Sequence, residues 1–173
     1  MGGQIESNMD NNYPVIEGGY LRDILDQPRA LERSVEGFAG SGALAALGDR
    51  LRGGGYRQVV LTGMGTSFHA LQPLLIELTD LGWPVTLAET SELIYYGARL
   101  LSPETLTIAV SQSGRSAETV RLLELNAGRS HLVGVTNEPE SPLAKGANAL
   151  VLTQAGAEHS VTCKTYVTTL AAL

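Results

Sequence analysis

Short aliphatic runs alternate with helical segments along most of the chain, and this alternation is the feature that most limits its fold. The runs are rich in Val, Ile, Leu and Thr, and they occupy residues 58–62, 85–88, 106–111, 132–136 and 149–153. Strands that are apolar on both sides and are joined by helices belong to a parallel sheet covered on both faces. We therefore predict an α/β fold, a three-layer αβα sandwich around a five-stranded parallel sheet.

Helical patterns fill the segments between these runs and also precede the first of them. We expect helices at residues 67–81, 91–96, 117–127 and 142–147, and, before the sheet, at residues 20–27, 28–39 and 43–52. Pro28 suits the first position of its helix. Pro73 lies inside the helix predicted at 67–81 and should kink it or mark an irregular start.

The domain organisation follows from the same patterns. With 173 residues the chain is long enough for one domain and short for two. Residues 1–19 indicate a flexible leader, and residues 20–173 a single domain, with N-terminal helices over 20–52 and the αβα core over 56–173. The apolar helix that begins at Val161 has no stop signal, so we expect the chain to be truncated within a longer protein.

Composition excludes several classes of function. The chain is 43% hydrophobic and 17% charged, as in soluble globular domains, and its net charge of −6 argues against nucleic-acid binding. No apolar run reaches the roughly 18 residues of a membrane span, and the N-terminus does not resemble a signal peptide, so we expect a cytoplasmic protein. The single cysteine, Cys163, and three scattered histidines have no metal-ligand spacing, so we expect no metal ion and no cofactor.

Two loops combine glycine with hydroxyl side chains directly after a strand. Residues 62–67 read Thr-Gly-Met-Gly-Thr-Ser, and residues 111–116 read Ser-Gln-Ser-Gly-Arg-Ser. Each leads into a helix, whose free N–H groups and dipole can bind an anion without a basic surface. In the flavodoxin-like strand order 2-1-3-4-5, the first and third strands are neighbours, and ligands bind at their carboxyl ends. Both loops would then line one crevice.

These loops leave alternatives open. A single hydroxyl-rich turn before a helix is usually only a helix cap, whereas two such turns at neighbouring strands favour a phosphate-type ligand. A dinucleotide such as NAD is another ligand class, because Gly63 and Gly65 follow a strand and Glu89 lies where a ribose-binding acid could sit. However, Phe68 occupies the third glycine position of that fingerprint, where it would obstruct close packing of helix and strand.

The sequence resembles the sugar isomerase (SIS) domain family, in particular the first SIS domain in the isomerase half of glutamine–fructose-6-phosphate aminotransferases. Four segments from about residue 20 onward carry the resemblance. They are Ile-Leu-Asp-Gln-Pro at 24–28, Gly-Thr-Ser at 65–67, Ser-Gln-Ser-Gly at 111–114, and Gly-Ala-Glu at 156–158 followed by Val161. The Ser-Gln-Ser-Gly loop between a strand and a helix is the most specific of them.

The resemblance implies which residues contact a sugar phosphate. By position in the family's motifs, the phosphate-binding residues are Ser67, Ser111, Gln112, Ser113 and Ser116. Thr66 would contact sugar hydroxyls, and Val161 and Cys163 hold the positions of further sugar contacts. The family's Ala-Ser-Thr-Lys segment reads Thr-Cys-Lys-Thr at 162–165, so Cys163 stands in place of a serine. Lys164 lies one place early, and we expect a structural role for it.

The resemblance implies no complete catalytic centre in this chain. In the aminotransferases a glutamate, a histidine and a lysine from a second SIS domain supply the catalytic groups, and neither that domain nor the glutaminase domain is present in this sequence. His69 is a weak candidate for a general base, since imidazole titrates near neutral pH, but a non-catalytic histidine is the simpler interpretation. Glu158 is the other weak candidate, for which an ordering role in its loop competes with proton transfer.

The expected function is therefore that of a phosphosugar-binding SIS domain. Its parent would be a ketose/aldose phosphate isomerase or a glucosamine-6-phosphate synthase- or deaminase-like enzyme, acting on a substrate of fructose 6-phosphate or glucosamine 6-phosphate type. One alternative is a sugar-phosphate-sensing regulatory module, although residues 1–56 contain no basic helix-turn-helix. Another is a structural subunit with an inactive pocket. We also expect a homodimer, with the second SIS domain as the natural intramolecular partner.

Overall fold

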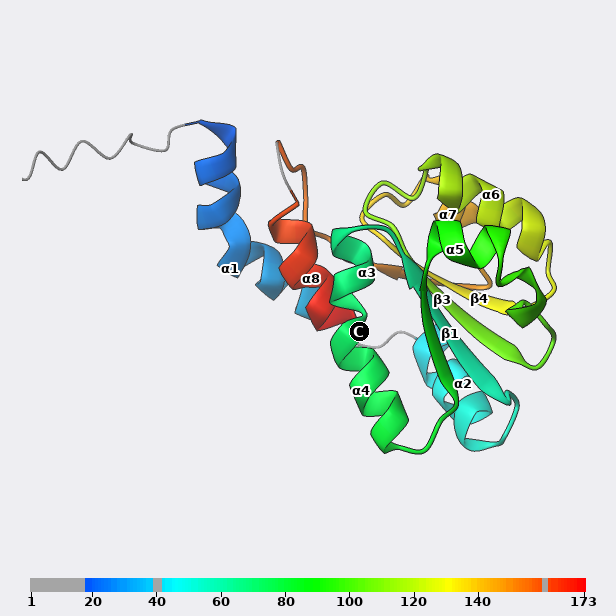
Figure 1. Ribbon diagram of the computed structural model, residues 1–173. Coiled ribbons are helices and arrows are strands. Elements are labelled where there is room, and N and C mark those ends of the chain that lie inside the picture. Colours follow the sequence, from blue (N-terminus) through cyan, green and yellow to red (C-terminus); the bar gives the residue numbers. More distant parts are fainter. Residues whose placement is uncertain (1–17, 39–41, 160–161) are drawn as a thin grey trace, which may run out of the picture.

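The computed structural model describes residues 18–38, 42–159 and 162–173, and these form one sheet with helices on both faces (Figure 1). All strand pairs are parallel, in the order β2-β1-β3-β4-β5. The strands are β1 (Gln58–Gly63), β2 (Val85–Glu89), β3 (Thr105–Val110), β4 (His131–Thr136) and β5 (Ala149–Leu152). The predicted αβα sandwich and strand order are confirmed. Of the predicted leader, residues 1–17 lie outside the described residues.

Two sets of helices cover the two faces of the sheet. Residues of α2, α4 and α8 pack against one face, and residues of α5, α6 and α7 pack against the other. The helices are α1 (Gly19–Phe38), α2 (Gly42–Arg52), α3 (Thr66–Ala70), α4 (Gln72–Asp80), α5 (Thr90–Tyr95), η1 (Ala98–Leu100), α6 (Ala117–Asn126), α7 (Pro142–Gly146) and α8 (Lys164–Ala172). In the described parts of the chain, none of them is long and apolar enough to cross a membrane.

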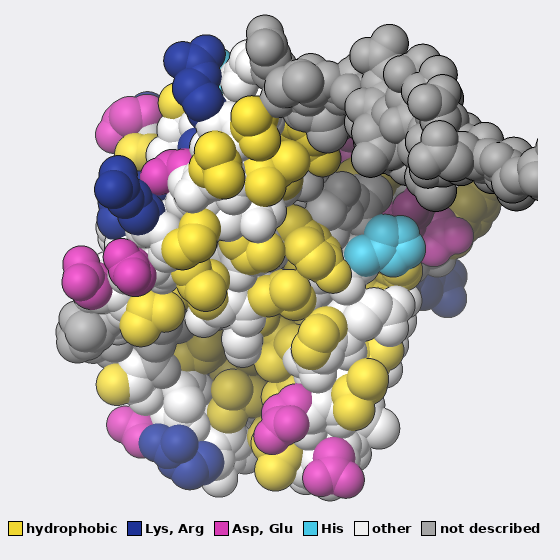
Figure 2. Space-filling view, turned by 90° about the vertical axis from the view of Figure 1, so that its left-hand side faces the viewer, with side chains coloured by type: hydrophobic (Ala, Val, Ile, Leu, Met, Phe, Trp, Pro, Cys, Tyr) yellow, Lys and Arg dark blue, Asp and Glu magenta, His cyan; other side chains and the backbone are white. Residues whose placement is uncertain are grey.

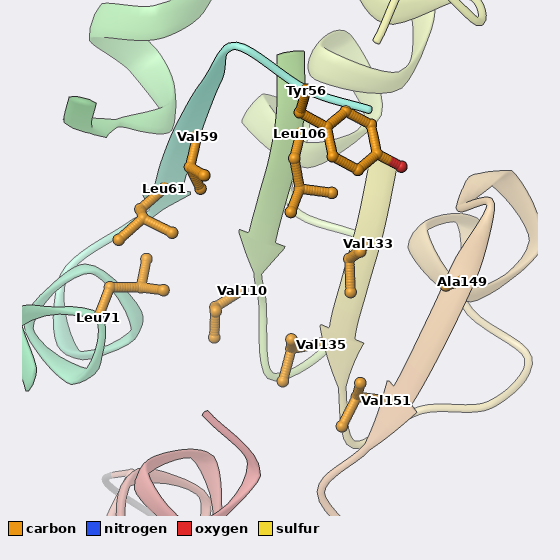
Figure 3. Close-up of a cluster of buried hydrophobic side chains, with 10 residues drawn as sticks. All are labelled: Tyr56, Val59, Leu61, Leu71, Leu106, Val110, Val133, Val135, Ala149 and Val151. Atoms are coloured by element: carbon orange, nitrogen blue, oxygen red, sulfur yellow. The ribbon is translucent and has the colours of Figure 1, made fainter. Parts of the chain in front are cut away.

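The strands read as continuous apolar runs because both faces of the sheet are buried. Along β1, Val59 and Leu61 belong to the core on one face and Val60 to the core on the other, and all three are fully buried. Figure 3 shows the first of these cores, in which side chains from β1, β3, β4 and β5 converge beneath the helices. The layers therefore fix the register of the strands, and with it the place where the loops after them meet.

Two prolines affect the helices differently. The helix predicted from 67 to 81 is interrupted at Leu71, and Pro73 lies in the first turn of α4, so the irregular start expected there is confirmed. The predicted break before Pro28 is wrong, because α1 runs through it without interruption. A proline inside a helix loses one backbone hydrogen bond. In α1 the packing of the helix along α8 holds the segment helical in spite of that loss (Figure 1).

Candidate functional site

The two glycine- and hydroxyl-containing loops meet at the carboxyl edge of the sheet. Since β1 pairs with β3, Gly63 lies beside Val110, and the loops that follow these residues are neighbours. Between them is a pocket of about 160 Å³. Its lining consists of Met64, Ser67, Val110, Ser111, Gln112, Ser113, Ser116 and Thr119. All five residues predicted to bind phosphate are therefore brought to one place.

Three serine hydroxyls in this lining are held by backbone N–H groups of their own loop or of the first turn of α6. Each oxygen accepts one hydrogen bond, at 3.2 to 3.4 Å. The pairs are Gly114 N–H to Ser111 Oγ, Arg115 N–H to Ser113 Oγ, and Thr119 N–H to Ser116 Oγ. A hydroxyl whose oxygen already accepts a bond still has its proton to donate. The pocket thus gathers O–H donors, which is what an anion requires.

Ser116 also caps the helix that points at the pocket. It is the N-cap of α6, with extended backbone, and its Oγ lies 2.9 Å from the Thr119 hydroxyl. Free N–H groups in the first turn of a helix and its dipole favour a negative charge. Thr119 is buried and lines the pocket, yet the sequence analysis missed it. Its position three residues after a helix-capping serine is the signal that could have identified it.

Gly114 lets this loop pack closely against the rest of the domain. Its φ is +60°, and a Cβ at this position would collide with the Ser141 side chain at the start of α7. The Gly114 carbonyl accepts a hydrogen bond from Leu143 N–H at 3.0 Å. Glycine adopts this left-handed backbone without the strain that a side chain introduces. The requirement for glycine in the loop therefore comes from both backbone conformation and space.

Asn137 connects this loop to the Gly-Ala-Glu segment after β5. The Gln112 carbonyl accepts hydrogen bonds from Thr136 Oγ1 at 3.0 Å and from Asn137 N–H at 3.1 Å. The Asn137 side chain accepts a hydrogen bond from Ala155 N–H at 2.8 Å and donates one to the Gly156 carbonyl at 2.9 Å. No local sequence pattern predicts this role, because the partners of Asn137 come from two other loops, one after β3 and one after β5.

Glu158 is engaged at the start of α8 and does not line the pocket. Its carboxylate accepts hydrogen bonds from the N–H groups of Cys163 and Lys164, both at 2.6 Å, and from the Thr165 hydroxyl at 2.8 Å. This geometry supports the ordering role. Burial, together with the Glu158 carboxylate, raises the pKa of Cys163, so its thiol is protonated near neutral pH. Val161, the other predicted sugar contact of this segment, lies outside the described residues.

Lys164 is buried, with 4% of its surface exposed, and it joins α8 to α1. Its Nζ lies 3.0 Å from Asp23 Oδ1 and 3.3 Å from Asp26 Oδ2, and it donates to the Ala157 carbonyl at 2.6 Å. Burial opposes its charge, but the hydrogen bonds to Asp23 and Asp26 outweigh that effect and raise the pKa of Lys164. These contacts support the structural role expected for this lysine.

The structure does not bring Thr66 or His69 into the pocket. Both side chains are exposed on α3, and the His69 ring packs edge-on against Phe68 with centroids 5.5 Å apart. The weak general-base candidate His69 therefore lies outside the lining of this pocket. The loop at Gly65 opens onto α3, which has only five residues and contains Phe68. Among the described residues, no three His, Cys, Asp or Glu side chains gather in a way that could hold a metal ion.

Comparisons with known proteins agree with this arrangement. Residues 56–173 match the family model of the SIS domain. A glutamine–fructose-6-phosphate aminotransferase (isomerizing) of Pyrococcus horikoshii is 34% identical over 164 residues, which cover 91% of this chain and 27% of the relative. The chain spans only 19% to 27% of the length of the first three such relatives.

Two solved structures have the same fold. A proposed phosphosugar isomerase of Silicibacter pomeroyi is 36% identical, with a TM-score of 0.71 over 87% of this chain and 46% of that one. A tagatose-6-phosphate ketose/aldose isomerase of Escherichia coli is 25% identical, with a TM-score of 0.73 over 90% of this chain and 46% of that one.

Proposed function

Because this chain belongs to the SIS domain family, we propose that its pocket binds the phosphate group of a phosphorylated sugar. One observation carries the proposal: the five hydroxyl and amide residues of two separate loops line a single pocket at the junction of β1 and β3. Hydroxyl donors and the N-terminus of α6 match the needs of a phosphate dianion. They offer nothing particular to a purine or a nicotinamide ring.

The size of the pocket suits the phosphate end of the ligand alone, with the sugar outside. Sites that enclose a whole drug-sized molecule have volumes of roughly 300 Å³ or more. The pocket here is about 160 Å³, which suits a phosphate with the carbon that carries it. In this proposal the sugar extends out of the pocket along the carboxyl edge of the sheet, where Thr66 and the start of α8 lie.

The proposal assigns this chain a binding and orienting role. Interconversion of an aldose and a ketose phosphate needs a base that moves a proton between two neighbouring carbons. The described lining of the pocket contains no carboxylate, imidazole or amine that could be that base. We propose that the catalytic groups come from a second SIS domain or subunit, and that the parent acts on a hexose 6-phosphate such as fructose 6-phosphate or glucosamine 6-phosphate. A sugar-phosphate sensor would use the same pocket without those groups.

Ligand-dependent thermal stability tests this function. Fructose 6-phosphate and glucosamine 6-phosphate should stabilise the protein, by about 2.7 kcal/mol at a concentration 100 times the dissociation constant. Ser113→Ala should weaken the binding tenfold or more, since a hydrogen bond to a charged group contributes roughly 1.5–3 kcal/mol. Ser102→Ala is the matched control, because Ser102 lies before β3, at the opposite edge of the sheet.

The controls make the result decisive. Inorganic phosphate should bind more weakly than either sugar phosphate, and NAD should not bind. Stabilisation by NAD alone, or by none of these compounds, would contradict the proposal. An equal loss of binding in both serine variants would also contradict the role of Ser113.

Two further expectations belong to the same proposal. We propose that the protein is a homodimer, supported by apolar side chains that gather on the side formed by α1, α4 and α8 (Figure 2). The large exposed apolar side chains on these three helices are Tyr20, Leu25, Leu31, Val35, Ile76 and Leu170. A cytoplasmic location remains a prediction from the sequence.

A further inference from the structure

The lining of the pocket carries no charged side chain that would attract its proposed ligand from a distance. Its eight described lining residues are all uncharged at neutral pH, and the whole chain carries a net charge of −6. A sugar phosphate approaches as an anion of nearly two charges. Hydroxyl donors stabilise that anion once it is bound, but they exert little force on it at a distance. The field of the whole molecule repels it.

Arg115 is the cation placed to offset this repulsion. It lies between Gly114 and Ser116 in the loop that forms one wall of the pocket. Its Nε donates to the carbonyl of Ser113 at 3.4 Å, while its backbone N–H donates to the Ser113 hydroxyl at 3.4 Å. The base of the guanidinium is thus held beside a residue of the pocket lining.

Within the described part of the chain, the guanidinium has no acidic partner. Among the residues that the structure describes, no Asp or Glu oxygen lies within 4.0 Å of Arg115. Arg121, on the helix that follows, instead pairs with Glu124 at 2.8 Å, and this pairing makes it a suitable comparison. Arg115 is exposed and lies in sequence between the lining residues Ser113 and Ser116, so its donors are available to a ligand.

From these observations we infer that Arg115 is the electrostatic capture residue of the pocket, which supplies through its charge the attraction that the neutral lining lacks. This inference rests on the proposed function. A charge at the rim of a site acts mainly on association and makes binding depend on salt. The guanidinium fork can then share the phosphate oxygens with the serine hydroxyls.

Calorimetric titration with fructose 6-phosphate and glucosamine 6-phosphate tests the inference on four variants. Arg115→Gln removes the charge, Arg115→Glu reverses it, Arg115→Lys retains it, and Arg121→Gln removes a charge that is already paired. Each protein is titrated in about 0.01 M and about 1 M salt, where the Debye lengths are about 30 Å and about 3 Å.

At low salt, Arg115→Gln should weaken binding about three- to tenfold, and Arg115→Glu should weaken it further. Arg115→Lys and Arg121→Gln should stay within about twofold of the unaltered protein. At high salt the differences should shrink to less than about twofold. Thermal unfolding of all variants should be the same, because Arg115 is exposed.

Two results would overturn the inference. In one, Arg115→Gln and Arg115→Glu bind as tightly as Arg121→Gln at low salt. In the other, Arg115→Lys binds as weakly as Arg115→Gln, which would mean that charge is not the cause. Both leave the proposed function intact. Failure of the unaltered protein to bind either sugar phosphate would instead refute the proposed function itself.

Discussion

At the scale of single residues, the candidate site depends on the direction of hydroxyl protons. Ser116 accepts a hydrogen bond from the backbone N–H of Thr119, and the two hydroxyls lie 2.9 Å apart. If the Thr119 hydroxyl also donates to Ser116 Oγ, the Ser116 proton is left to point into the pocket. Thr119 is buried, so its hydroxyl has few other partners. It would act on the ligand through Ser116, as a positioning residue.

Substitution of Thr119 separates this role from simple packing. Thr119→Val keeps the shape but removes the hydroxyl, and it should weaken sugar-phosphate binding about three- to tenfold, which corresponds to one net hydrogen bond. Thr119→Ser keeps the hydroxyl and should bind like the unaltered protein, although it removes a buried methyl group. Titration calorimetry with fructose 6-phosphate measures both. If valine binds as well as threonine, or serine as weakly as valine, the hydroxyl does not orient Ser116.

At the scale of secondary-structure elements, a group of charges joins α1 to α8. Lys164 lies between Asp23 and Asp26, and His159 N–H donates to Asp23 Oδ2 at 2.7 Å. The hydrogen bond from this N–H is the main cause that lowers the pKa of Asp23 from 3.8 to about 2, with the His159 and Lys164 side chains adding to it and burial opposing it. The charged form of Asp26 is favoured as well, because its hydrogen bond with the Arg33 guanidinium lowers its pKa.

The lowered pKa of Asp23 predicts how stability depends on pH. Because the carboxylate is favoured in the folded state, its contribution is complete above the unfolded pKa of 3.8 and is lost as the pH falls toward 2. Asp23→Asn should therefore be less stable than the unaltered protein above about pH 5, and the gap should narrow as the pH falls toward about 2. Urea unfolding at each pH, followed by circular dichroism, measures this difference in unfolding free energy.

A second aspartate provides the control for this experiment. Asp49 pairs with Arg52 at 2.7 Å, but both side chains are more than 70% exposed. Exposed ion pairs contribute little to stability, so Asp49→Asn should change the unfolding free energy by less than about 1 kcal/mol. If the difference in unfolding free energy between Asp23→Asn and the unaltered protein does not vary with pH, the pKa of Asp23 is not lowered in the folded state.

The sequence predicted the features that depend on local patterns, but not those that depend on contacts between distant elements. The five strands were predictable because layers on both sides of a parallel sheet require continuous apolar runs. The pocket serines were predictable because their loops combine hydroxyls with glycine after neighbouring strands. The contact of Lys164 with Asp26 joins residues 138 positions apart, and no local pattern encodes it. The continuity of α1 through Pro28 was missed for the same reason, since its packing on α8 is tertiary.

At the scale of the whole molecule, the apolar surface and the pocket lie in separate places. The apolar side chains in Figure 2 lie over α1, α4 and α8, whereas the pocket opens at the carboxyl edge of the sheet. Leu25 and Ile76 are about 70% exposed, and Val35 is 56% exposed. Tyr95 and Tyr96, at the end of α5, are also exposed.

This distribution predicts the effect of charge on self-association. If the surface on α1 joins two copies, Val35→Glu should shift the protein to monomer, because it places a like charge on both sides of a symmetric contact. Tyr96→Glu serves as a control on a different part of the surface. Sedimentation velocity measures both. A monomer for the unaltered protein at all concentrations, or a dimer that persists in Val35→Glu, would contradict this surface as the interface.

The packing of α1 on α8 also determines where this protein can be divided. The match to the family begins at residue 56, but both carboxylates that neutralise Lys164 belong to a helix that ends at Phe38. A fragment that starts at residue 56 would lose the cover of α8 and leave an amine without its counter-charges, an arrangement that costs several kcal/mol when the amine stays buried. Fusion or recombination with another domain should therefore carry α1 along, since the smallest portable unit extends beyond the part that defines the family.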